Sequence, residues 1–147
     1  INQFGHVLVA PGGTIYAIGT TGAGLTANVV VCAFTANGTR KWSRSIGTNN
    51  VAEGGQHAYF EGSSLWVSST YQTFTNTRML LFQIDTATGA TIQNQKILSN
   101  GNVNFSTVAT FSSRNFFARS KGGVVAIGVD NAAGVHNNFM ITSLKRV

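Results

Sequence analysis

Histidine is the residue type in this chain best suited to holding a metal ion, and it occurs three times, as His6, His57 and His136. No two of these stand two or four positions apart, and the carboxylates are scattered along the chain. Zinc sites usually combine such ligands at short, regular spacings. His6 and His57 take similar places in two copies of an internal repeat, which accounts for them without a ligand. We therefore expect neither a metal ion nor a cofactor.

Catalysis by a nucleophile or by paired acids is not favoured either. No serine lies in a Gly-x-Ser-x-Gly elbow, and Cys32 has no activating neighbour. The four acidic residues include no close pair that would serve as general acid and general base. They are Glu53, Glu61, Asp85 and Asp130. The glycine loop at residues 22–24 precedes a predicted strand and lacks the lysine of a phosphate-binding loop. We expect a protein that is not an enzyme.

Aromatic side chains are better candidates for binding, because exposed aromatic faces stack on sugars and bases. We predict a ligand site at Trp42, Tyr71 and Phe74, with Arg44 beside Trp42 in sequence. The alternative is that these aromatic residues pack between strands and loops, as we expect for Trp66 among its apolar neighbours.

Two sequons for N-glycosylation are present, at Asn37 and Asn104. In a chain so rich in Asn, Ser and Thr, two sequons are also expected by chance. Both fall at predicted loop positions, where a glycan has room.

The elements that position these residues come from a repeat. The apolar run at residues 15–19 returns at 65–69 and again at 124–128. A second apolar run follows each copy after a polar stretch. These second runs are residues 29–34, 79–84 and 139–144. Self-similarity at a period of about 50 residues indicates a repeat architecture.

Composition agrees with an all-β fold. The chain has 147 residues, 43% hydrophobic and only 10% charged, with 17 glycines. Asn, Ser, Thr and Gly are unfavourable inside helices, while Thr is common in strands and Asn, Ser and Gly are common in turns. No apolar stretch approaches the ~20 residues that span a bilayer, so we expect no membrane insertion. The single cysteine excludes an internal disulfide and is expected to be a buried thiol.

Charge gives a weaker indication of partners. The net charge of +6 reflects scarce acids more than dense bases. A positive field attracts anionic partners, but solubility explains it more simply, and we consider nucleic acid an unlikely ligand. The chain begins at Ile1 rather than Met, which fits a processed or exported protein. We expect an extracellular or cell-surface location.

The strands expected in the first unit, at about residues 6–47, are 6–10, 14–20, 28–35 and 39–46. Pro11-Gly12-Gly13 marks one turn, and Asn37-Gly38 predicts a type I′ hairpin, in which both central residues have positive φ. The second unit, at about residues 56–99, repeats this order with strands 56–61, 64–70, 78–85 and 90–98, after a linker at 49–55.

The third unit, at about residues 115–147, has strands 115–120, 124–130 and 137–145, so it is one strand short. An insertion at residues 100–113 precedes it and contains a possible extra strand. Residues 1–5 resemble the last strands of the first two units, so we expect them, or a partner, to complete the third unit. Ile1, Phe4, Phe139 and Ile141 are the predicted assembly edge.

Three stretches of sequence carry a resemblance to a known repeat. They are residues 13–20 and 31–42 in the first unit and 81–91 in the second. They resemble β-propeller blades of the pyrroloquinoline-quinone-like and related seven-bladed-propeller repeat families. In those families a glycine precedes the second strand, an Asp or Asn with a Gly shapes the hairpin, and a tryptophan lies on the outer strand.

The resemblance implies a propeller-like array of four-stranded antiparallel blades, about three in this single domain, whether or not they belong to a larger ring. Only the first unit carries the outer-strand tryptophan, Trp42. Quinone-dependent dehydrogenases of this type need central acidic residues and Ca²⁺. The four scattered acids of this chain do not support carrying that chemistry over.

The sequence therefore predicts a non-catalytic scaffold or assembly module. It joins other copies of itself, or flanking blades of a longer chain, through open blade edges and loops. One alternative is a carbohydrate-binding, lectin-like propeller with polysaccharide as its partner. A second alternative is a fragment of a larger propeller enzyme whose catalytic groups lie in other blades.

Overall fold

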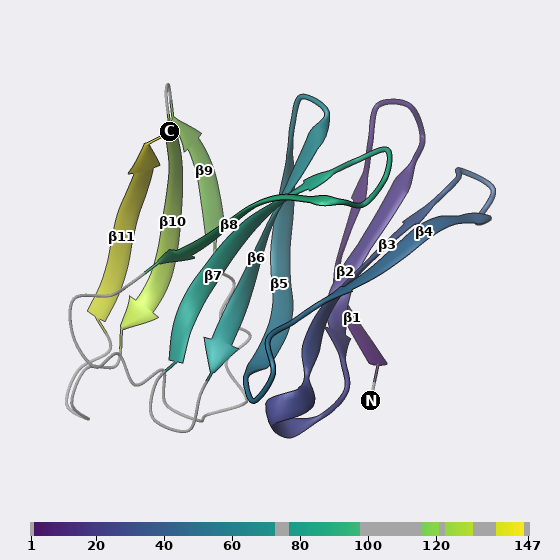
Figure 1. Cartoon of the computed structure of the whole chain (residues 1–147). Helices are drawn as coiled ribbons and strands as arrows, with labels where there is room; N and C mark the ends of the chain where they lie inside the picture. Colours follow the sequence, from purple (N-terminus) through teal and green to yellow (C-terminus); the bar gives the residue numbers. More distant parts are fainter. Residues whose placement is uncertain (1, 73–76, 98–115, 121–122, 131–137, 146–147) are drawn as a thin grey trace.

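The computed structural model describes residues 2–72, 77–97, 116–120, 123–130 and 138–145 (Figure 1). These residues form an all-β structure, in which the one short helical element is a 3-10 turn, η1 (Gly24–Thr26). Three antiparallel sheets follow one another along the chain. The described residues do not close into a ring. No helix in this part of the chain is long and apolar enough to cross a membrane.

The first sheet contains four strands in sequence order, as the turn signals predict. They are β1 (Asn2–Val9), β2 (Ile15–Thr21), β3 (Asn28–Phe34) and β4 (Arg40–Ile46). The second sheet repeats this order. Its strands are β5 (Ala52–Glu61), β6 (Ser64–Gln72), β7 (Thr77–Asp85) and β8 (Thr91–Ile97).

The third sheet has three strands among the described residues, as predicted. They are β9 (Phe116–Ser120), β10 (Gly123–Asp130) and β11 (Asn138–Lys145), with β10 in the middle. The insertion at 100–113 and its possible extra strand lie outside the described residues.

The structure corrects the expectation for the N-terminal segment. Residues 2–5 do not form a separate strand for another sheet, because they continue β1 and pair with β2. Asn2 lies opposite Thr21 and Phe4 opposite Gly19. A bulge at Gly5, which the sequence pattern does not reveal, hides this continuity. The predicted linker at 49–55 is likewise shorter, since β5 begins at Ala52.

The turn at Asn37-Gly38 also differs from the predicted type I′ hairpin. Gly38 has a φ of 87°, but Asn50 is the only non-glycine residue with positive φ in the described part of the chain. The Thr35 N–H donates to the Thr39 carbonyl oxygen at 2.8 Å, and the Gly38 N–H to the Thr35 carbonyl oxygen at 3.0 Å. This is the longer hairpin loop in which only the last residue is left-handed, so only glycine is required there.

The two four-stranded sheets match each other in register as well as in order. In both, the first strand carries a bulge one residue before a histidine, at Gly5 and at Gln56. In both, the third and fourth strands also shift register at the hairpin end, next to Phe34 and Ile84. Residues with the same place in the register of different sheets are called matching positions below.

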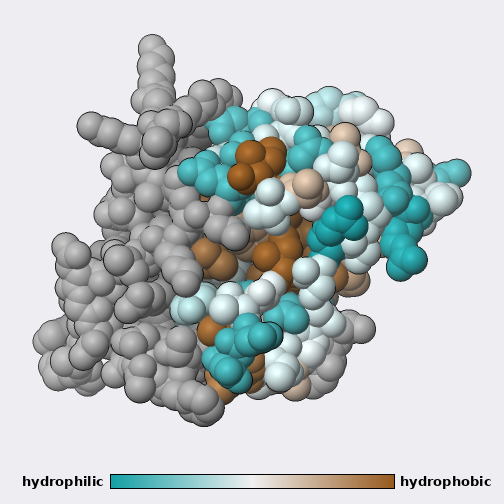
Figure 2. Space-filling model, in the orientation of Figure 1, coloured by the Kyte–Doolittle hydropathy of each residue, from teal (hydrophilic) through white to brown (hydrophobic). Residues whose placement is uncertain are grey.

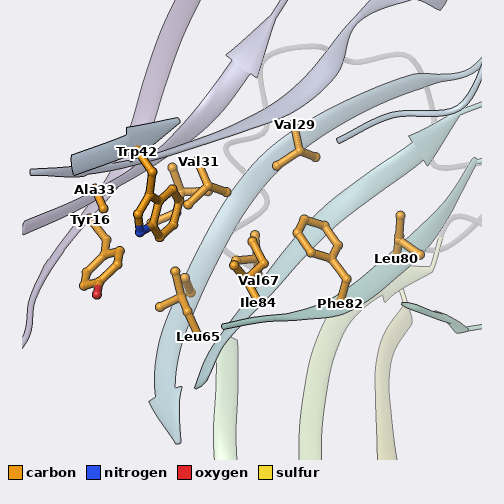
Figure 3. Packing of buried hydrophobic residues seen from close by; sticks show 12 residues of the cluster. Tyr16, Val29, Val31, Ala33, Trp42, Leu65, Val67, Leu80, Phe82 and Ile84 are labelled. Atoms are coloured by element: carbon orange, nitrogen blue, oxygen red, sulfur yellow. The ribbon is translucent and has the colours of Figure 1, made fainter. Parts of the chain in front are cut away.

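The first two sheets pack face to face and form one hydrophobic core, which we call the seam (Figure 3). The first sheet contributes a row of buried side chains, which we call its inner face. This face comprises Tyr16, Ile18, Val29, Val31, Ala33 and Trp42. The second sheet contributes Ala58, Leu65, Val67, Leu80, Phe82 and Ile84. In Figure 2 apolar atoms are concentrated in the middle of the view, with hydrophilic atoms around them.

β5 lies against the first sheet at a glycine. A Cβ atom on Gly55 would lie 2.6 Å from the Gly19 carbonyl oxygen and 2.8 Å from Ile18 Cγ2. Both distances are shorter than real Cβ contacts, and the oxygen belongs to the backbone of β2. The absence of a side chain at residue 55 therefore sets how closely the two sheets approach.

We predict that Gly55→Ala lowers the free energy of unfolding by roughly 1–3 kcal/mol, because the new methyl group forces the two strands apart. Urea denaturation followed by circular dichroism measures this change. Gly12→Ala is the matched control, because a Cβ at Gly12 meets no atom within 4 Å. Equal stability of the two variants would contradict a close approach at Gly55.

Candidate functional site

Two of the predicted ligand residues, Trp42 and Arg44, lie together on β4, against the turn between β7 and β8. The Trp42 indole N–H donates to the Thr86 carbonyl oxygen at 3.2 Å, and Arg44 donates to the Thr88 carbonyl oxygen at 2.8 Å. Trp42 is only 9% exposed. A Cβ on Gly89 would lie 2.7 Å from its ring. These contacts place Trp42 and Arg44 at the seam. Trp42 therefore packs between the two sheets, which is the alternative to a ligand site that the sequence left open.

Tyr16 completes this end of the seam. Its hydroxyl donates to the same Thr86 carbonyl oxygen at 3.1 Å. Its ring lies 5.8 Å from the Trp42 ring and 5.4 Å, edge-on, from the Phe60 ring. Burial raises the pKa of the Tyr16 hydroxyl, although its hydrogen bond to Thr86 offsets part of that effect. One backbone oxygen of the second sheet thus holds two aromatic side chains of the first.

Tyr71, another of the predicted ligand residues, does not join this group. Tyr71 lies near the far end of β6, opposite Glu53 and Arg78, and packs half-buried against the core. Phe74 lies outside the described residues. The structure therefore does not bring Tyr71 together with Trp42 and Arg44.

His6 and His57 meet at the seam, on the first strands of the two sheets. Their ring centroids are 4.1 Å apart, with 30° between the ring planes. Burial lowers the pKa of both histidines below the ordinary 6.5. A hydrogen bond to the Ala58 backbone partly offsets this for His6, and proximity to His6 lowers the pKa of His57 further. The pair is therefore most compatible with the fold when uncharged.

The histidine pair has no third ligand for a metal ion in the described ranges, where no group of three or more His, Cys, Asp and Glu residues could hold one. The third histidine, His136, lies outside those ranges. The sequence predicted that His6 and His57 take similar places in two repeats. In the structure the two rings pack against each other between the two sheets.

The predicted glycosylation sites fall in different parts of the chain. Asn37 is exposed in the turn between β3 and β4. Its side-chain oxygen accepts hydrogen bonds from the Thr39 N–H at 3.2 Å and from the Thr35 hydroxyl. Asn104 lies outside the described residues, so the prediction for it stays a prediction.

Of the four predicted assembly residues, three fall among the described strands. Phe4 is 49% exposed on β1. Phe139 and Ile141 lie on β11, opposite Val129 and Ile127 of β10. Ile1 lies outside the described residues.

Phe4 belongs to a larger apolar surface, which we call the outer face: the face of the first sheet turned away from the second. Side chains alternate between the two faces of a strand, so the residues between those of the inner face make up the outer face. Its apolar members are Phe4, Val7, Val9, Ile15, Ala17, Val30, Cys32 and Phe34. Cys32 contacts Ser43 of β4 on this same face at 3.3 Å.

Sequence reasoning missed all of this surface except Phe4. The signal was present, because every residue of the outer face from Val7 onward matches a buried or half-buried apolar residue of the second sheet in register. Aligning the two units residue by residue, rather than by their apolar runs, would have found it. No protein-family model and no curated protein matches the chain.

We predict that stability falls as the pH drops below about 6.5. Between the lowered histidine pKa values and 6.5, the folded chain binds fewer protons than the unfolded chain. The contribution of the pair is therefore complete above that window and is lost as the pH falls through it. Thermal unfolding at several pH values between about 5 and 7.5 measures the slope.

His57→Phe should flatten this slope, and it places at residue 57 the residue type found at the matching position of the third sheet, Phe116. Asp85 does not interfere, because hydrogen bonds from Thr88 hold its pKa below 3.8, outside the measured range. A slope unchanged by His57→Phe would show that the histidine pair does not cause it.

Proposed function

We propose that this chain is a non-catalytic assembly module that joins another β-sheet through the outer face of its first sheet. In this proposal the three sheets are propeller-like blades, and the outer face is the side on which a neighbouring blade packs. An extracellular or cell-surface location remains our expectation for such a scaffold.

The observation that carries the proposal is the match between the outer face and a face already buried in the molecule. Ile15, Ala17 and Val30 match Leu65, Val67 and Leu80 in register. Those three residues of the second sheet are at most 6% exposed, because they pack on the inner face of the first sheet. The outer face has the same apolar character at the same places.

Exposure on β1 supports a docking role. Phe4, Val7 and Val9 are 49%, 57% and 64% exposed, whereas Ala58 and Phe60, which match Val7 and Val9, are buried or half-buried. Covering each of the three side chains is worth about 1 kcal/mol, given 1.5–3 kcal/mol for complete burial of such a side chain. Contiguous apolar surface of this kind is typical of interaction sites.

The sequence pointed to strand edges as the place of assembly, and the structure favours a face. The segment expected to complete another sheet is already paired with β2 in its own sheet. What the first sheet still offers is its outer face, which includes Phe4 from the predicted set. Face-to-face packing also joins the first two sheets, so the proposal uses a contact type that this chain already makes.

The propeller-like arrangement is supported by the first strands of the sheets. β5 contacts β1 and also β9, so the first strands lie next to one another while the later strands fan outward (Figure 1). This is how blades surround a propeller axis. The sugar-binding alternative loses its best aromatic residue, because Trp42 is buried at the seam.

We predict that the double variant Val7→Lys, Val9→Lys abolishes docking through the outer face, since two charges would be buried in an apolar contact. Two readouts are needed. Light scattering detects self-assembly, and fluorescence of 8-anilinonaphthalene-1-sulfonate detects the face when it is uncovered.

The matched control is Ala36→Lys, Ala87→Lys, which adds the same charge at two exposed turn residues. The folded wild type and the control should either self-assemble or bind the dye. The variant Val7→Lys, Val9→Lys should do neither. A wild type that neither assembles nor binds the dye would overturn the proposed function.

A further inference from the structure

We propose that Asn37 is the acceptor of an N-linked glycan, carried at the tip of the hairpin between β3 and β4. The glycan is independent of docking through the outer face. It depends on the proposed function only for location, because the chain must enter a secretory compartment that contains a glycosylating enzyme. The stretch Asn37-Gly38-Thr39 has the required pattern, with a hydroxyl residue two positions after the asparagine and no proline between them.

The turn that carries Asn37 projects into open space. Asn37, Gly38 and Thr39 are exposed. A Cβ atom added at Gly38 would meet no atom within 4 Å. In Figure 1 the turn between β3 and β4 lies at the right-hand end of the molecule, where this hairpin projects outward. A bulky, hydrated group attached there would displace no packed side chain of the described residues.

The corresponding turn of the second sheet, between β7 and β8, has no such space. Gly89 in that turn is buried, and a Cβ atom added there would lie 2.7 Å from the Trp42 ring. The Thr86 carbonyl oxygen of the same turn accepts hydrogen bonds from Tyr16 and Trp42. The packing of the first two sheets thus covers the turn of the second sheet and leaves the turn of the first sheet open.

The Asn37 side chain is held by its oxygen rather than by its nitrogen. Oδ1 accepts hydrogen bonds from the Thr39 N–H at 3.2 Å and from the Thr35 hydroxyl. A backbone N–H can only donate, so the atom that it meets is the amide oxygen. Both bonds therefore engage Oδ1, and neither involves Nδ2. They also polarise the amide, which makes a proton on Nδ2 easier to remove.

The transfer needs that nitrogen, a transferring enzyme and an oligosaccharide linked to a lipid pyrophosphate. A bond forms between Asn37 Nδ2 and the anomeric carbon of the sugar, while the bond from that carbon to the pyrophosphate breaks. The pyrophosphate leaves with the electron pair, and Nδ2 loses one proton to a base of the enzyme. Because the sugar is attached through nitrogen, Oδ1 can keep both of its hydrogen bonds. The glycan should therefore leave the turn unchanged.

The test is mass spectrometry of the chain secreted from eukaryotic cells behind a secretion leader. Wild-type peptides should carry a glycan at residue 37, and a peptide N-glycosidase should remove it and leave aspartate there. Thr39→Ala should lose the glycan, because the hydroxyl of the sequon is gone. Thr39→Ser is the matched control and should keep it. Both variants retain the N–H that donates to Asn37, so the comparison isolates the hydroxyl.

Cell-free translation with endoplasmic-reticulum microsomes gives a second readout that does not require secretion. There the glycan appears as a shift in electrophoretic mobility. Asn104→Gln is included in every chain in this assay, so that the shift reports on Asn37 alone. A glycan in either experiment supports the proposal. An Asn37 that is unmodified in both, or one modified equally in Thr39→Ala, would overturn it.

Two further measurements separate the glycan from stability and from docking. The glycosylated chain should unfold at a temperature no lower than the enzyme-treated chain, in which aspartate still offers oxygen to both hydrogen-bond donors. A lower unfolding temperature would contradict an open turn. Val7→Lys, Val9→Lys should carry the glycan as the wild type does, so a failure of glycosylation and a failure of docking are observed independently.

Discussion

The close approach of β5 to β2 at Gly55 is the contact on which the rest of the structure depends. A side chain there would collide with the backbone of Gly19 and with Ile18. With no side chain, the second sheet lies close enough for His57 to stack on His6 and for the two apolar faces to interdigitate. At the outer end of the same seam, the Thr86 carbonyl oxygen accepts hydrogen bonds from Tyr16 and Trp42. The seam is thus fixed at both ends.

This arrangement explains why residues that resemble a binding site have structural positions. Histidine, tyrosine and tryptophan side chains each combine an apolar ring with a polar atom. They can pack between two sheets when that polar atom has a hydrogen-bond partner. Trp42 uses its indole N–H at the seam, and burial favours the uncharged form of the two histidines by lowering their pKa. The side chains that could bind a ligand therefore lie in the packing between the sheets, and the surface that remains for a partner is apolar.

Because the first two sheets match in register, the exposure of each face can be compared position by position. A face that is buried in one sheet and exposed at the matching positions of another is a surface without its neighbour. Val7 and Val9 are exposed where Ala58 and Phe60 are covered.

The strands, their order and most of their turns could be predicted from the sequence alone. Apolar alternation and the Pro11-Gly12-Gly13 and Asn37-Gly38 signals are local, and local signals specify local structure. The sequence did not reveal the bulges at Gly5 and Gln56, because one extra residue in a strand leaves no mark in composition. Which faces of the first two sheets are covered follows only from their tertiary packing. Alternation tells which residues share a face, but the neighbour of that face depends on how the sheets pack, and that is set by contacts far apart in the chain, such as Gly55 on Gly19.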